Sequence, residues 1–302
     1  MSGNQALVLT YHRVASGRDP FGQAVTPATF SAQMESLRGL AEVVPLEALD
    51  RPERGRRVAI TFDDGYGDNA RIAAPILLAS GLPATFFIPG RVVAEPGEYW
   101  WDRLEHLHLD NAPSVPALTL AIRGRELTVD LRSAAGRLRS LKALNRRFRT
   151  LGLDEIDSLV EQVRVRLDAE PTVPCDEHAV LTSADLAALA DQPAFEIGSH
   201  AFTHTMLSAL SPREQERELV DSRRTLEEAT GREVTSLAYP YGIEGAYDAA
   251  TIEAARTAGY ARACTNVGGS GSRRDLFRLP RRMVLDWPAD AFASRVRDWF
   301  RA

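Results

Sequence analysis

The amino-acid sequence predicts an α/β fold built on a parallel sheet or barrel. Short apolar runs typical of buried strands alternate along the chain with stretches in which apolar residues recur at helical spacing. Polar residues directly follow several of these apolar runs, as expected where the carboxyl ends of parallel strands form an active site. The length of 302 residues suits one α/β barrel, so we expect a single domain over residues 1–302.

The expected elements follow one another in strand-then-helix order. The expected strands cover residues 6–11, 57–62, 83–88, 195–199, 234–239, 260–265 and 277–284. The expected helices cover residues 29–40, 69–80, 212–230 and 247–258. Gly81, Gly231 and Gly259 follow three of these helices, and glycine is the residue that most often ends a helix.

Residues from about 95 to 180 break this rhythm. They include Trp100 and Trp101, a proline-containing stretch near 113–116 and an arginine-rich helical pattern near 133–149. We interpret the segment as a mainly helical insertion in one barrel and not as a separate domain. Long additions to a compact barrel are often lids or binding loops, so we expect it to shape substrate access.

Composition excludes several classes of protein. The formal net charge is −5 and no basic stripe is visible, so a nucleic-acid partner is not expected. No stretch reaches the roughly 20 apolar residues of a membrane-spanning helix, and no secretory leader is visible at the N-terminus, so we expect a cytoplasmic protein. Cys175 and Cys264 form no C-x-x-C pair, and we expect both to be small buried residues.

Paired carboxylates follow the expected strand at 57–62. Residues 61–65 read T-F-D-D-G, so Asp63 and Asp64 lie where the strand ends and the chain turns. The pair could serve acid–base or metal chemistry. Taken alone, it could equally be an Asp-Gly turn that caps the next helix.

Two of the six histidines lie four residues apart after the expected strand at 195–199. Residues 198–204 read G-S-H-A-F-T-H, and neutral imidazoles are good ligands for zinc and similar metals. Two histidines and one carboxylate leave metal positions open for water and substrate. His200 and His204 could also be unrelated surface residues, but the D-D-G strand end in the same chain favours the metal site.

A third motif, Y-P-Y-G at residues 239–242, is by itself only a turn pattern. In their order, T-F-D-D-G, S-H-x-x-x-H and Y-P-Y-G resemble the motifs of the polysaccharide deacetylases, the NodB-homology family of carbohydrate esterase family four. The opening L-T-Y-H-R-V at residues 9–14 and F-R-L-P-R at 277–281 are similar to that family as well. The resemblance covers about residues 6–295 and implies a distorted (β/α) barrel.

The resemblance also implies roles for the motif residues. Asp63 would be the general base, and Asp64, His200 and His204 would bind one divalent metal ion. We expect zinc, with other divalent transition metals as alternatives. The backbone N–H of Tyr241 would help form the oxyanion hole.

Two departures from the family pattern concern the catalytic machinery. Many members carry an arginine two residues before the proline of the third motif, where this chain has Ala238. Arg281 could replace it and orient Asp63, or it could be a surface arginine. The family's late Leu-x-His, which supplies the general acid, is missing, because no histidine follows His204. The acid would then be His12 or Asp63 itself, although His12 could also be a core histidine.

The sequence therefore predicts a metal-dependent hydrolase that removes an N-acyl group from an amino sugar, and N-acetyl is the leading candidate for that group. Nucleotide-linked, lipid-linked or small glycosides are the expected substrates. Hydrolysis of another amide, such as a sugar formamide or a ureide, is an alternative. A catalytically silent carbohydrate-binding barrel is another. Trp100 and Trp101 could stack on a sugar face or anchor the insertion.

Overall fold

The computed structural model describes residues 5–50, 55–110, 115–171, 178–267 and 275–301. The chain divides into two compact units, one comprising residues 1–96 and 180–302 and the other residues 97–179. Each unit is described by itself below.

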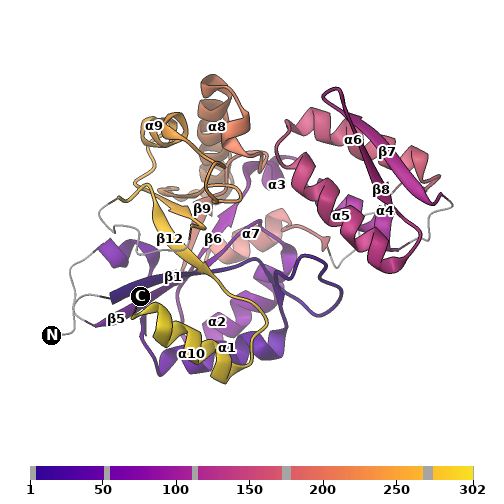
Figure 1. The fold of residues 1–302 in the computed structure, drawn as a ribbon. Coiled ribbons are helices and arrows are strands. Elements are labelled where there is room, and N and C mark those ends of the chain that lie inside the picture. Colours follow the sequence, from indigo (N-terminus) through magenta and orange to yellow (C-terminus); the bar gives the residue numbers. More distant parts are fainter. Residues whose placement is uncertain (1–4, 51–54, 111–114, 172–177, 268–274, 302) are drawn as a thin grey trace. The chain divides into compact units, whose positions relative to one another are not determined.

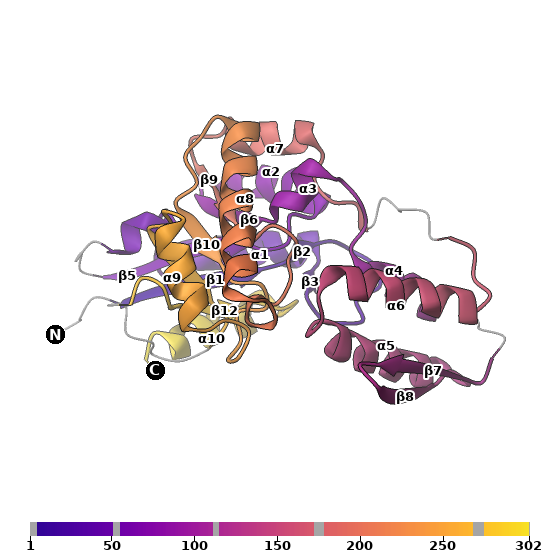
Figure 2. The same ribbon diagram turned by 90° about the horizontal axis from the view of Figure 1, so that it is seen from above.

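Seven parallel strands close into a barrel in the first unit (Figures 1 and 2). In their order around the barrel they are β1 (Gln5–Tyr11), β12 (Leu279–Met283), β11 (Arg262–Thr265), β10 (Ser236–Ala238), β9 (Phe195–Ser199), β6 (Ala84–Ile88) and β5 (Arg56–Phe62), which returns to β1. A short strand, β4 (Glu42–Val43), pairs with the first residues of β5 outside the ring. This ring has seven strands, whereas a regular (β/α) barrel has eight. The prediction of a distorted barrel is therefore confirmed.

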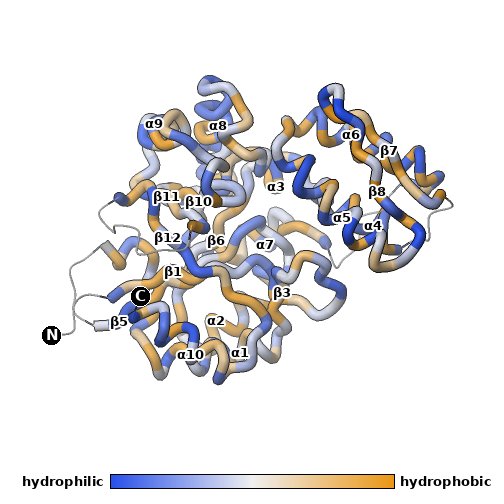
Figure 3. The backbone as a smooth tube through the Cα atoms, in the orientation of Figure 1, coloured by the Kyte–Doolittle hydropathy of each residue, from blue (hydrophilic) through white to orange (hydrophobic). Residues whose placement is uncertain are grey.

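Helices surround this barrel (Figure 1). They are α1 (Pro27–Arg38), α2 (Ala74–Ser80), α3 (Gly90–Ala94), α7 (Ser183–Ala190), α8 (Pro212–Thr230), α9 (Ala249–Thr257) and α10 (Ala289–Trp299). The longest, α8, begins with a capping box at Ser211 and ends at Gly231, which has a φ of 65°. Hydrophobic residues dominate the strands β1 and β6, whereas α8 carries hydrophilic stretches (Figure 3).

The barrel interior changes from apolar to polar along its strands. Val8 and Ala59 belong to a buried apolar cluster with Phe87 and Leu279. Two residues further along the same strands, the hydroxyls of Thr10 and Thr61 lie 2.8 Å apart. Because alternate residues of a strand share a face, the next inward position on β5 after Thr61 belongs to Asp63. The sequence alternation thus places a carboxylate at the polar end of an otherwise apolar interior.

Among its described residues, the second unit contains three helices and a hairpin. The helices are α4 (Trp100–Leu109), α5 (Ala134–Phe148) and α6 (Leu153–Arg166), and the hairpin pairs β7 (Ala117–Ile122) with β8 (Arg125–Asp130). Arg123 and Gly124 form the hairpin turn with positive φ angles, as two-residue hairpin loops require. This hairpin was not expected from the sequence, although Leu118, Leu120 and Ile122 alternate with exposed residues in the pattern of a strand.

Two further observations bear on the composition. No helix among the described residues is long and apolar enough to cross a membrane. Cys264 is fully buried, as expected, whereas Cys175 lies outside the described residues.

Trp100 and Trp101 occupy different environments. Trp100 is 6% exposed, and its ring lies 6.1 Å from that of Phe148 in α5. Trp101 is only half-buried and stacks on Tyr99 with 4.2 Å between ring centroids. The packing of Trp100 makes it a core residue of the second unit.

Replacing Trp100 with alanine should therefore lower stability by about 3–5 kcal/mol, the usual cost of deleting a buried aromatic side chain. Trp101→Ala is the matched control and should cost less than about 1.5 kcal/mol. Calorimetric melting of the full chain measures both. A melting temperature unchanged by Trp100→Ala would show that this ring is not part of a core.

Candidate active site

The predicted site residues gather at the carboxyl ends of the barrel strands. His12 directly follows β1, Asp63 follows β5, and His200 follows β9. Backbone pairing continues past the strand ends, since the N–H of Asp63 donates to Tyr11 and that of His200 to Ile88, both at 3.0 Å. Asp63 and His200 are thus held by the neighbouring strand even though each begins a loop.

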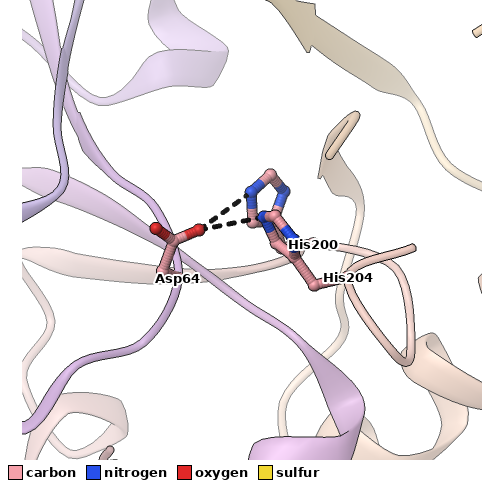
Figure 4. A group of neighbouring side chains, drawn as sticks. All are labelled: Asp64, His200 and His204. Carbon is pink, nitrogen blue, oxygen red and sulfur yellow. Dashed lines mark ion pairs between the residues drawn. The ribbon is translucent and has the colours of Figure 1, made fainter. Parts of the chain in front are cut away.

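Asp64, His200 and His204 form one compact group (Figure 4). An Asp64 carboxylate oxygen lies 3.1 Å from Nε2 of His204 and 3.4 Å from Nε2 of His200. Nδ1 of His200 lies 2.7 Å from the carbonyl oxygen of Ala238, so this nitrogen carries the hydrogen. The hydrogen bond leaves the lone pair of Nε2 facing Asp64, which is the usual arrangement of a metal-ligating histidine. Two imidazole nitrogens and one carboxylate oxygen are a donor set that suits zinc and similar metals.

The loops that carry these residues are strained. Asp64, Ala201, His204 and Tyr241 have φ angles of 73°, 59°, 60° and 63°. They are four of the six non-glycine residues with positive φ in the described part of the chain. Left-handed backbone costs free energy in non-glycine residues and persists only where surrounding structure enforces it. Its concentration here indicates that side-chain placement outweighs local backbone preference.

Asp63 and Arg281 form a buried ion pair beside this group. Both side chains are about 1% exposed, and Nη1 and Nη2 of Arg281 each donate to one Asp63 oxygen at 2.6 Å. Arg281 lies within β12 and reaches Asp63 through the barrel interior. Two parallel hydrogen bonds fix both the position and the plane of the carboxylate. The second Asp63 oxygen lies 3.8 Å from Nε2 of His200.

The charges of the site shift the pKa values of its members. Burial alone would raise the pKa of Asp63, but the Arg281 guanidinium and His200 outweigh it and hold that pKa below its ordinary value. Burial would likewise raise the pKa of Asp64, yet its contacts with the His200 and His204 imidazoles keep that pKa well below its usual range. Burial lowers the pKa of His204. In His200 the attraction of Asp63 and Asp64 overcomes burial and raises the pKa. The negative charges of Asp63 and Asp64 would attract a divalent cation to this group in the same way.

His12 lies close enough to lower the pKa of both carboxyl groups. The residue is 7% exposed, and Nδ1 of its ring has no hydrogen-bond partner among the described residues. The backbone carbonyl of His12 accepts a hydrogen bond from the Asn69 side chain at 2.9 Å, which fixes the start of the loop.

Tyr241 is tied to Arg281 through Asn266. The Asn266 side chain donates to the Tyr241 carbonyl oxygen at 3.1 Å and accepts from Nε of Arg281 at 3.1 Å. The backbone of Gly242 passes so close that a Cβ there would lie 2.7 Å from the Asn266 nitrogen. The glycine of the third motif is therefore needed for this close approach. The Tyr241 ring also lies 5.0 Å from that of His204, edge to face.

Comparison with known proteins identifies the fold and the family. The family model described as polysaccharide deacetylase matches residues 50–114 and 172–263, which is more than half of the chain. The chain belongs to the polysaccharide deacetylase family. This membership confirms the resemblance seen in the motifs.

One curated relative of this chain is distant in sequence. YxkH of Bacillus subtilis, which is named for the same family, is 24% identical over 273 residues, or 88% of this chain. The match spans 66% of the length of YxkH.

Two solved structures share the fold, each with a TM-score of 0.62 over 97% of this chain. The polysaccharide deacetylase BC0361 of Bacillus cereus is 18% identical, with 69% of its chain covered. The Streptococcus pyogenes deacetylase PplD, solved in complex with acetate, is 16% identical, with 97% covered.

Glu218, which no motif of the sequence indicated, holds the loop between the two histidines. From α8, its carboxylate accepts from the N–H groups of Phe202 and Thr203 at 2.9 and 2.8 Å, and from the Thr203 hydroxyl at 2.8 Å. Burial raises its pKa, partly offset by the Thr203 N–H. Ser222, one turn later, donates to the Ala201 carbonyl at 2.7 Å. Polar residues at i and i+4 on the inward side of α8 could have indicated this role.

Removing Arg281 should move the acidic limb of the pH profile of kcat/KM to higher pH. Arg281 lowers the pKa of Asp63, so without it the carboxylate becomes protonated at higher pH. Arg281→Lys keeps the charge but loses the paired hydrogen bonds, and should lower kcat/KM by about 100-fold through misplacement of the carboxylate. Arg282→Ala, on the half-exposed other face of β12, is the control and should leave the profile unchanged. An acidic limb unmoved in Arg281→Ala would contradict a role in holding Asp63.

Glu218→Ala should weaken metal binding about 10-fold, because the loop that presents His200 and His204 loses three hydrogen bonds. Zinc titration against a chromophoric chelator measures the dissociation constant. Glu228→Ala, an exposed position on the same helix, serves as control. Equal zinc affinity in the two variants would mean that the loop keeps its conformation without Glu218.

Proposed function

We propose that the chain is a metal-dependent carbohydrate de-N-acetylase, a hydrolase of linear amide C–N bonds. The observation that carries the proposal is the donor group of Asp64, His200 and His204 beside the buried Asp63–Arg281 pair, in a member of the polysaccharide deacetylase family. Bound by those three residues, a divalent ion such as zinc would polarise the amide carbonyl and acidify water.

The residues of the chain supply the proton chemistry. Asp63 is the proposed general base, since Arg281 keeps it ionised and fixed while His200 borders its second oxygen. The backbone N–H of Tyr241 is the proposed donor to the developing oxyanion. His12 or the protonated Asp63 would protonate the departing amine. His12 has a ring nitrogen without a hydrogen-bond partner among the described residues, which supports it.

An N-acetylated amino sugar is the proposed substrate. The family and the acetate bound to the related PplD support an acetyl group. Nucleotide-linked, lipid-linked or small glycosides in the cytoplasm remain the substrates predicted from the sequence. The close arrangement of Asp63, Asp64, His200 and His204 argues against a silent binding barrel, because binding a sugar requires no such donor group.

Mass spectrometry of a panel of N-acylated sugars, incubated with the zinc-loaded chain, tests the proposal. We expect release of the acyl group from at least one N-acetylated sugar. Asp63→Asn should keep its metal but lose at least about 100-fold in rate, because the amide cannot accept a proton from water. Near wild-type turnover in Asp63→Asn would remove Asp63 from the role of base. Turnover only of formamides or ureides would replace the proposed substrate.

A further inference from the structure

A second group of potential metal ligands lies in the unit of residues 97–179. Glu98 precedes α4, His106 lies in its last turn, and His178 is the penultimate residue of the unit. One ligand atom from each of the three residues lies within 4.8 Å of the others. Residues from the two ends of the unit therefore meet at one point.

The ligand atoms converge as closely as those of the barrel site. Nε2 of His106 lies 2.8 Å from Oε1 of Glu98 and 3.1 Å from Nδ1 of His178. Nδ1 of His178 is 3.7 Å from the same Glu98 oxygen. In the barrel site the corresponding distances from Asp64 are 3.1 and 3.4 Å.

Both histidines have a carboxylate at the ring nitrogen that faces away from this point. Nδ1 of His106 pairs with Asp110, at the end of α4. Nε2 of His178 lies 4.0 Å from the carboxylate of Glu105. A hydrogen-bonded carboxylate at the far nitrogen, as Asp110 is for His106, fixes the ring and is the usual partner of a metal-ligating histidine. Glu105 adds negative charge beside His178 without a hydrogen bond between the two.

Glu98 supplies an independent observation. Its side chain is 3% exposed, and neither carboxylate oxygen accepts a hydrogen bond from the described residues. The contact with Nε2 of His106 is an ion pair when that imidazole is protonated, and an imidazole nitrogen and a carboxylate oxygen that bind one cation approach each other in the same way. A buried carboxylate requires a compensating cation.

We propose that Glu98, His106 and His178 form a second metal-binding site, independent of the proposed catalytic site. Two imidazole nitrogens and one carboxylate oxygen favour zinc or a similar transition metal over magnesium or calcium, which prefer oxygen ligands. The metal joins the start of the unit to its end. Binding that closes a long segment stabilises the folded state, so this site is structural.

Metal stoichiometry tests the proposal in the full chain without an affinity tag. The variant His200→Ala/His204→Ala removes two ligands of the barrel site, and after chelation it should still take up about one cobalt or zinc ion per chain. Adding His106→Gln should abolish that uptake. His108→Gln is the matched control, because His108 is a buried histidine of the same helix whose Nδ1 faces the Leu104 carbonyl.

Zinc should also raise the melting temperature of the His200→Ala/His204→Ala variant, and cobalt should give a visible absorption band that His106→Gln removes. If that variant binds no metal, the proposal is overturned and the cluster is an ion-pair network around a protonated histidine. Uptake that survives His106→Gln equally overturns it.

Anomalous diffraction from cobalt-soaked wild-type crystals decides the matter if a variant fails to fold, since a missing peak at His178 excludes the site. Neither result depends on deacetylase activity.

Discussion

The buried ion pair between Arg281 and Asp63 is the constraint around which the barrel site is organised. Two opposite charges, each about 1% exposed, are costly to desolvate unless their hydrogen bonds are complete. Here both Asp63 oxygens accept from the guanidinium, whose Nε donates to Asn266. The pair joins residues 218 positions apart, and this contact exists only because β12 and β5 both pair with β1. Closure of the barrel and ionisation of Asp63 are therefore coupled.

The strained loops extend this constraint to the other side chains. Asp64, His204 and Tyr241 adopt left-handed backbone, which local sequence preference disfavours. The surrounding structure enforces it, because α8 holds the histidine loop through Glu218 and Ser222, and Asn266 holds Tyr241. The loop after β9 and the turn after β10 are therefore held in place by hydrogen bonds, as the strands are. Such rigidity is what a metal site with defined ligand positions requires.

The departure from the family pattern at Ala238 has a structural counterpart. Ala238 belongs to the apolar cluster that includes Phe87 and Cys264, so no charge lies on β10 at this level. The charge comes instead from Arg281 on β12, whose guanidinium lies 5.4 Å from the Phe87 ring. Neighbouring strands of a barrel project side chains into one shared interior. A cation can thus reach the same carboxylate from a different strand.

The sequence by itself determined the order of the barrel strands and of four helices around them, and its motifs indicated the distorted barrel and the residues suited to metal and proton chemistry. These properties follow from local periodicity and from motifs within a few residues, as for Asp63–Asp64 and His200–His204. The tertiary structure decided which distant residues meet: Arg281 with Asp63, Glu218 with the histidine loop, and Glu98 with His178. No local pattern encodes these pairs, because each depends on chain closure over many residues and on which face of an element turns inward.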